Sequence, residues 1–127
     1  MDDNEAVSEL IAARLLSFGG IGFAGRLDPS TDAYHHLRKR GEQALPLIER
    51  VLDEGTPAGR AYAATLLKHL DEQAGNAAWE RLAGEPGEIR FYSGCISSGF
   101  PLAEYARRAI DLPDAPPGLA APYYDQG

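Results

Sequence analysis

Apolar and small residues recur at helical spacing along residues 56–70, around most of the circumference of the expected helix. Thr56 suits the N-cap, because its hydroxyl can accept from a free amide of the first turn, and Pro57 suits the first helical position. Two adjoining faces result, formed by Ala58, Ala61, Tyr62, Thr65, Leu66 and His69 and by Ala63, Ala64, Leu67 and Leu70. A helix with so little polar surface is normally buried between neighbours. The pattern therefore predicts that the chain is organised around this helix.

The same periodicity predicts further helices on both sides of the central one. In chain order they cover residues 4–18, 32–40, 42–54, 77–83 and 101–110. Ser30 or Thr31 is expected to cap the second of these and Asn76 the fourth. Only Gly55 separates residues 42–54 from the central helix, so we expect these two helices to form an antiparallel hairpin.

The helix expected over residues 4–18 has apolar residues at positions i, i+3, i+4 and i+7. They are Val7, Leu10, Ile11, Leu15 and Phe18. Glu5 and Glu9 fall near its start, where negative charge suits the partial positive charge of a helix N-terminus.

Residues 88–96 support two interpretations. The run Ile89-Arg90-Phe91-Tyr92 has strand propensity, but a solitary strand would have nothing to pair with. We therefore expect a short helix, with a strand as the alternative. Residues 113–127 are rich in proline and glycine, which predicts a solvated tail after a single all-α domain over residues 1–112.

The composition is that of a globular chain and narrows the class of partner. Hydrophobic residues make up 44% of the sequence and charged residues 24%, and a net charge of -7 corresponds to a pI near 4.8. This acidity disfavours nucleic acid and anionic membranes and is compatible with a basic protein partner, although acidity also serves solubility. The acidic start Met1-Asp2-Asp3-Asn4-Glu5 differs from a signal peptide, and no apolar run reaches bilayer length. We therefore expect a cytoplasmic protein.

The glycine-rich motif Gly20-Ile21-Gly22-Phe23-Ala24-Gly25 matches the dinucleotide-binding fingerprint literally. That motif works between a strand and a helix whose N-terminus meets the pyrophosphate. Here a predicted helix precedes it and the turn Arg26-Leu27-Asp28-Pro29-Ser30 follows it. We therefore expect no cofactor and interpret the segment as a helix–helix connector. Its length of about 11 residues exceeds that of most such connectors, which favours a surface feature with Phe23 and Arg26 exposed.

Residues 44–67 resemble a HEAT repeat, the helical hairpin of armadillo-type repeat proteins. In that family the first helix carries a proline, an aspartate stands at the turn, and the second helix opens near a basic residue before an alanine-rich stripe. Pro46, Asp53 and Arg60 occupy those places. The resemblance implies antiparallel helical hairpins stacked as a short α–α superhelix, a turn tied by the carboxylate of Asp53 and the guanidinium of Arg60, and a role in binding other macromolecules.

A weaker second copy of the repeat follows about 30 residues later, a period within the range of solenoid proteins. The matching positions are Leu52, Arg60, Tyr62 and Leu66 in the first copy and Leu82, Arg90, Tyr92 and Ile96 in the second. In the second copy Gly94 replaces Ala64, and Pro86-Gly87 loosens the turn. The first 40 residues do not repeat and are expected to act as a cap.

Few residues suggest catalysis or metal binding. Cys95 is the single cysteine, which excludes an internal disulfide and a zinc pattern, and we interpret it as packing rather than as a nucleophile activated by His69. His35 and His36 are adjacent, so on a helix they point about 100° apart and cannot share a metal ion. The sequence has no His-Glu dipeptide of the metal-binding, hydroxylase-like HEAT proteins, and its acidity differs from the basic groove of the DNA-glycosylase-like ones.

These observations predict a non-catalytic protein-binding module, either a small HEAT-like adaptor or an immunity-type inhibitor whose acidic surface covers a basic partner. Aromatic residues and arginine most often dominate interface energy, so the expected contact residues are Phe23, Arg26, Arg90, Phe91 and Tyr92. Core packing is the alternative for the last two. Two other classes stay open: an enzyme using Cys95 with His69 or the pair His35 and His36, and a small-ligand site beside the glycine-rich connector, rimmed by Phe23 and Arg26.

Overall fold

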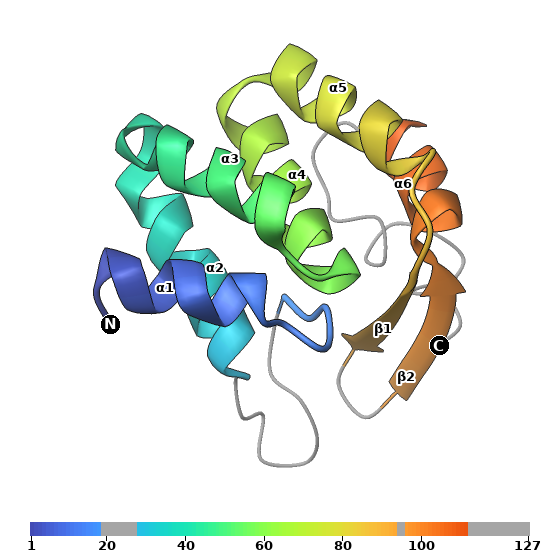
Figure 1. The fold of residues 1–127 in the computed structure, drawn as a ribbon, viewed down its shortest axis with the longest axis horizontal. Coiled ribbons are helices and arrows are strands. Elements are labelled where there is room, and N and C mark those ends of the chain that lie inside the picture. The colour runs from blue at the N-terminus through green and yellow to red at the C-terminus, as the bar shows by residue number, and fades with distance from the viewer. Residues whose placement is uncertain (19–27, 94–95, 112–127) are drawn as a thin grey trace.

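The computed structural model describes residues 1–18, 28–93 and 96–111. In chain order the elements are α1 (Asp3–Ile11), α2 (Pro29–Arg40), the 3₁₀ helix η1 (Gly41–Ala44), α3 (Leu45–Glu54), α4 (Pro57–Leu70), α5 (Glu72–Leu82), β1 (Glu88–Ser93), β2 (Ile96–Pro101) and α6 (Leu102–Asp111). This part of the chain is mostly helical, as predicted, and carries an antiparallel β-hairpin at one end (Figure 1). Within the described ranges, no helix has the length and apolar character needed to cross a membrane.

α4 is the helix around which the other elements pack. The Thr56 hydroxyl caps it by accepting from the Gly59 amide at 3.0 Å, and Pro57 occupies the first turn. Helices α1, α2, α3, α5 and α6 and strand β1 all contact it. Its residues from Ala58 to Leu67 are buried, apart from Arg60. The predicted central helix is therefore confirmed, together with its cap and its burial.

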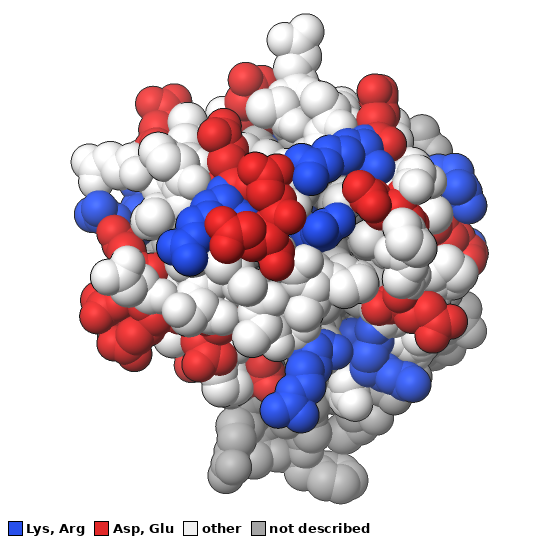
Figure 2. All heavy atoms as spheres, in the orientation of Figure 1, with Lys and Arg blue, Asp and Glu red and all other residues white. Residues whose placement is uncertain are grey.

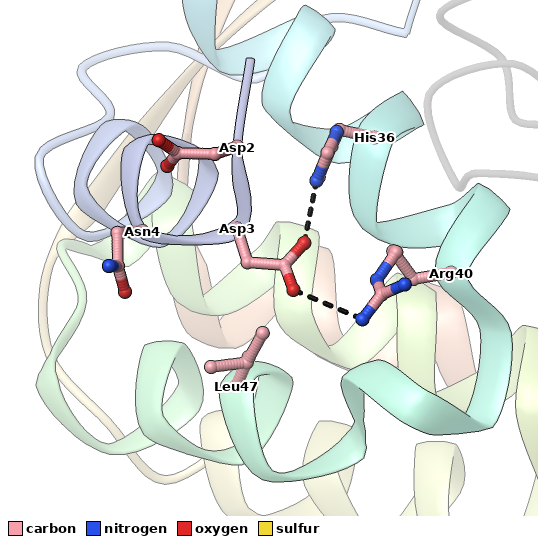
Figure 3. A pocket seen from close by; sticks show the side chains of 6 residues that line it. All are labelled: Asp2, Asp3, Asn4, His36, Arg40 and Leu47. Carbon is pink, nitrogen blue, oxygen red and sulfur yellow. Dashed lines mark hydrogen bonds and ion pairs between the residues drawn. The ribbon is translucent and has the colours of Figure 1, made fainter.

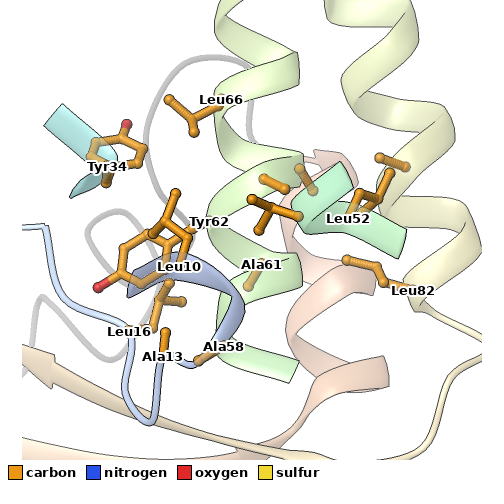
Figure 4. Close-up of a cluster of buried hydrophobic side chains, with 14 of the residues drawn as sticks. Leu10, Ala13, Leu16, Tyr34, Leu52, Ala58, Ala61, Tyr62, Leu66 and Leu82 are labelled. Carbon is orange, nitrogen blue, oxygen red and sulfur yellow. The ribbon is translucent and has the colours of Figure 1, made fainter. Parts of the chain in front are cut away.

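The core extends from α1 through α4 to α6. Figure 4 shows Leu10 and Leu16 beside Tyr62, and Leu52 and Leu82 farther along the same cluster. Edge-to-face contact between Phe18 and Tyr62, with ring centroids 5.5 Å apart, adds the segment after α1 to this core. Burial of each such large side chain stabilises the fold by about 1.5–3 kcal/mol.

Two glycines allow neighbouring helices to approach α4 closely. A Cβ atom on Gly59 would lie 2.1 Å from the carbonyl oxygen of Leu10 in α1. A Cβ atom on Gly75 of α5 would lie 2.3 Å from Cα of Lys68 in α4. Real carbon atoms do not approach so closely, so the packing of α1 and α5 on α4 depends on the missing side chains.

The end of α1 differs from the prediction. The helix ends at Ile11 rather than at residue 18, and residues 13–18 are not helical. The main chain of Leu16 instead hydrogen-bonds to β1, with its amide donating to the Arg90 carbonyl at 2.8 Å and its carbonyl accepting from the Tyr92 amide at 2.9 Å. Local periodicity contains no information on these distant partners, which is why it extended the helix too far.

Two other helices begin earlier than expected because aspartates cap them. The Asp28 carboxylate accepts from the Ser30 amide at 3.0 Å, so α2 starts at Pro29 and neither Ser30 nor Thr31 is its cap. In the same way Asp71 caps α5, which starts at Glu72 and continues through the break expected before residue 77. Asn76, the expected cap, lies inside that helix.

The short helix expected over residues 88–96 is wrong. Residues 88–93 form β1, which pairs antiparallel with β2, and Phe91 lies opposite Ser98 in the register. The strand has the partner that it was expected to lack, and that partner carries little strand propensity in Ser97-Ser98-Gly99. Arg90 and Tyr92, assigned to a helix of the weaker repeat copy, therefore lie on a strand.

Candidate functional site

A buried hydrogen-bond network joins the two segments that flank residues 19–27. The hydroxyl of Tyr62, on α4, accepts from the Ser17 amide at 2.8 Å and donates to the Ser17 carbonyl at 2.9 Å. The Ser30 hydroxyl lies 3.1 Å from the Tyr62 oxygen, and the Thr31 hydroxyl donates to the Ser17 carbonyl at 2.8 Å. One tyrosine of the central helix therefore holds together both ends of the glycine-rich connector.

The role of this hydrogen-bond network is structural. Burial raises the pKa of Tyr62 above its usual value, against the opposing effect of its hydrogen bonds to Ser30 and Thr31. The phenol is therefore neutral at physiological pH. The Ser30 hydroxyl donates to the Asp28 carboxylate at 2.6 Å, but Ser30 is only 2% exposed, so a substrate cannot reach its oxygen.

Beside the network, a surface hollow of about 350 Å³ separates the end of α1 from the start of α2. We call it the α1–α2 hollow, and its lining residues are Glu9, Ala12, Ala13, Arg14, Leu15, Asp28, Pro29 and Ser30. Glu9 and Arg14 are exposed and Asp28 is half-buried. Among the described residues, none of these three charged side chains forms an ion pair. The hollow thus presents two carboxylates and one guanidinium beside apolar side chains.

Sequence reasoning missed the α1–α2 hollow because it placed the end of α1 seven residues too late, at 18 instead of 11. In a helix that continued to residue 18, Glu9 would lie near the start, where its charge is favourable. It lies in the last turn of α1, where the helix dipole disfavours a carboxylate. With the helix end placed at Ile11, the sequence would have shown that the last turn contains the acidic Glu9 and no base, and that Ala12-Ala13 follow it.

The expected contact residues on β1 separate between its two faces. Arg90 is exposed and lies over Gly99 of β2, and Tyr92 is half-buried. Phe91 is only 3% exposed and packs among the rings of Phe18 and Tyr105, so the alternative of core packing applies to it. The other expected contact residues, Phe23 and Arg26, fall outside the described part of the chain.

A second hollow, of about 650 Å³, lies between the start of α1 and the last turns of α2 (Figure 3). There the Asp3 carboxylate contacts Nε2 of His36 at 2.7 Å and Nη2 of Arg40 at 3.2 Å. The hydrogen bond from His36 and the charge of Arg40 lower the pKa of Asp3, and partial burial opposes them. These three side chains satisfy one another and hold α1 to α2, which makes the cluster a structural joint.

Among the described residues, those considered for catalysis or metal binding do not converge. The His35 ring packs edge-on against Tyr34, with centroids 5.2 Å apart, whereas His36 is bound to Asp3. Within the described ranges, no group of three or more His, Cys, Asp and Glu side chains is arranged to hold a metal ion. His69 is exposed near the end of α4, and Cys95 is outside the described residues.

The turn between α3 and α4 is tied by arginine, but in a different way from the predicted ion pair. Arg60 donates from Nε to the Gly55 carbonyl at 3.0 Å and from Nη2 to the main-chain carbonyl of Asp53 at 3.3 Å. The Asp53 carboxylate pairs instead with Arg81 of α5 at 2.8 Å. The main-chain carbonyls at a helix C-terminus carry partial negative charge, so they attract a guanidinium in place of a carboxylate. The Asp53 side chain is therefore available to pair with α5.

The described residues define a mostly helical domain with a β-hairpin, an acidic surface and several hollows lined by charged residues. Comparison with protein-family models, with curated proteins and with solved structures found no match to this chain. Its function has to be inferred from its fold, its charge and the geometry of its surface.

Proposed function

We propose that this protein is a non-catalytic protein-binding module, a small HEAT-like adaptor or immunity-type inhibitor, which covers a basic surface of another protein. One observation carries the proposal: exposed carboxylates gather on neighbouring helices. This surface, the acidic face, consists of Asp2, Glu5 and Glu9 at α1 and Glu42, Glu49, Asp53 and Glu54 at η1 and α3. On the face drawn in Figure 2, acidic side chains lie over the region of α1 and α3, with basic side chains among them and toward β1.

The cations near the acidic face pair with part of it, and Arg81 of α5 binds the Asp53 carboxylate at 2.8 Å. Arg50 is the single Lys or Arg on α1, η1 and α3, and it pairs with Glu54 at 3.1 Å. Glu5, Glu9, Glu42 and Glu49 form no ion pair within the described chain. Even when it forms, an exposed ion pair contributes only about 0–1 kcal/mol to stability, so these carboxylates add little to the stability of the fold. They act instead as a source of electrostatic attraction for a cationic partner.

The HEAT-like part of the proposal is supported by the hairpin of α3 and α4. These helices pack against each other and are joined through Gly55 and Thr56 alone. Pro46 lies in the first turn of α3, and Arg60 lies in the first turns of α4, as the resemblance implies. Helical hairpins of this kind present broad surfaces of side chains to other macromolecules.

Charge reversal on the acidic face tests the proposal. Wild-type protein, the variant Glu42→Lys/Glu49→Lys and the control Glu80→Lys/Glu88→Lys are used as baits in native lysate at moderate salt. All four glutamates are exposed, and the two variants change the net charge equally. The expected result is a stoichiometric basic partner that binds the wild type and the control and is lost with the acidic-face variant. Recovery of no such partner, or equal loss with both variants, would refute the proposal.

A further inference from the structure

We propose that the α1–α2 hollow receives a single lysine or arginine side chain of the basic partner, with Glu9 and Asp28 as the carboxylates that contact its charged end. This inference rests on the proposed function and adds to it the residues that select a particular side chain. It is carried by the shape of the hollow and by the charges that surround it.

The first electrostatic argument concerns the end of α1. A helix C-terminus carries a partial negative charge, which basic residues usually offset. The last turns of α2, α4, α5 and α6 contain such residues, whereas the last turn of α1 contains Glu9 and no base, and that of α3 likewise contains acidic residues and no base. Glu9 and the helix dipole thus reinforce one another at the hollow, and an incoming cation relieves the repulsion between them.

The second argument concerns Asp28, whose position is fixed while part of its carboxylate stays available. One oxygen, Oδ2, accepts from both the amide and the hydroxyl of Ser30, at 3.0 and 2.6 Å. These bonds cap α2 and orient the carboxylate. A carboxylate has about four acceptor positions, so Asp28 can accept further hydrogen bonds from a cation in the hollow.

The apolar side chains of the hollow suit the stem of a basic side chain. Ala12, Ala13, Leu15 and Pro29 provide small apolar surfaces between the charged groups. Lysine and arginine carry several methylene groups that pack on such surfaces while the charged end stays near solvent. A volume of about 350 Å³ suits one long side chain rather than a helix or strand of the partner.

The surroundings hold the hollow in shape. The buried hydroxyl of Tyr62 binds Ser17 and Ser30 and so joins the segment after α1 to the start of α2. A preformed site spends less free energy on ordering when it binds. Arg14 lines the same hollow and opposes an incoming cation, and this gives the proposal a second prediction of opposite sign.

The experiment uses Nα-acetyl-L-arginine amide as the probe and its neutral citrulline counterpart as the chemical control. Binding to the ¹⁵N-labelled full chain is followed by NMR, and the expected amide shift changes centre on Ala12 and Ala13. Glu9→Gln should weaken binding about fivefold, and Arg14→Gln should strengthen it about twofold to fivefold, as expected for partly exposed charges. The matched control is Glu80→Gln, an exposed glutamate on α5 outside the acidic face, which should change binding less than twofold.

Shift changes of equal size with citrulline, or spread over all acidic residues, would overturn the proposal. An equal effect of Glu9→Gln and Glu80→Gln would overturn it as well, because it would indicate a general response to net charge. The two proposals fail separately. Glu42→Lys/Glu49→Lys tests the acidic face without touching the lining of the hollow, and Glu9→Gln tests the hollow while leaving most of the acidic face intact.

Discussion

Replacing Tyr62 by phenylalanine removes one oxygen atom that takes part in several hydrogen bonds in the core. That oxygen accepts from the Ser17 amide, donates to the Ser17 carbonyl and lies within hydrogen-bond distance of Ser30. The ring of Tyr62 stays, so apolar packing in Tyr62→Phe is nearly unchanged. The effect of the variant therefore isolates the polar network that holds the two ends of the connector.

The size of the effect follows from which groups keep a partner. In Tyr62→Phe the Ser17 carbonyl still accepts from Thr31, and the Ser30 hydroxyl still donates to Asp28. The Ser17 amide loses its acceptor in a residue that is 1% exposed. Removing the acceptor of one buried donor costs about 1–3 kcal/mol. A loss of about 2 kcal/mol lowers the melting temperature of a domain of this size by roughly 8 °C.

Urea unfolding and thermal melts of Tyr62→Phe measure this loss, with Tyr34→Phe as the matched control. Tyr34 is as deeply buried as Tyr62, but its hydroxyl interacts with the exposed Arg38, so its removal should cost less than about 1 kcal/mol. Hydrogen exchange adds a local readout, because the Ser17 amide should exchange faster in Tyr62→Phe. Equal stabilities of the two variants would refute the network as a source of stability.

Three further predictions concern packing and pH. Gly75→Ala should destabilise the protein by about 2–3 kcal/mol in urea unfolding, because the added methyl group would overlap the main chain of α4. This overlap outweighs the better helix propensity of alanine. The exposed control Gly84→Ala should be neutral or slightly stabilising. Burial raises the pKa of Tyr34 and Tyr62 above 10.0, so their contribution to folding stability is present below pH 10 and is lost as pH rises through the folded-state pKa. The free energy of unfolding measured from pH 8 to 12 should therefore fall, and it should fall less steeply in Tyr62→Phe. The pKa of Asp3 is lowered from 3.8, so its stabilising contribution is present above that pH and is lost as pH falls through the folded-state value. Asp3→Asn should therefore flatten the decline of stability between pH 5 and 2. An unchanged slope would contradict a stabilising contact of Asp3 with His36 and Arg40.

The elements predicted correctly are those whose signals are local. Thr56 and Pro57 mark the start of α4, and the apolar faces that follow require neighbours on several sides. Gly55 and the short turn specify the hairpin of α3 and α4 in the same way. In each case the residues that determine the element lie within a few positions of it, so periodicity and capping are sufficient.

The elements predicted wrongly depend on partners far along the chain. The end of α1 is decided by hydrogen bonds between Leu16 and β1, more than 70 residues later. β1 itself is decided by pairing with β2, whose central residues Ser97-Ser98-Gly99 have little strand propensity. Both errors affect the candidate site. The α1–α2 hollow lies at the early end of α1, and Phe91 is buried on one face of strand β1.

The sequence by itself therefore determined a mostly helical chain built around α4, an acidic charge and the absence of a recognisable catalytic motif. The tertiary structure decided which carboxylates share a surface and which polar groups become buried. Glu9 and Asp28 are separated by 19 positions in the sequence, yet they line one hollow because Tyr62, from a third segment, holds the surrounding main chain together. Such a juxtaposition depends on packing between distant segments, and helical periodicity records only neighbours within one turn.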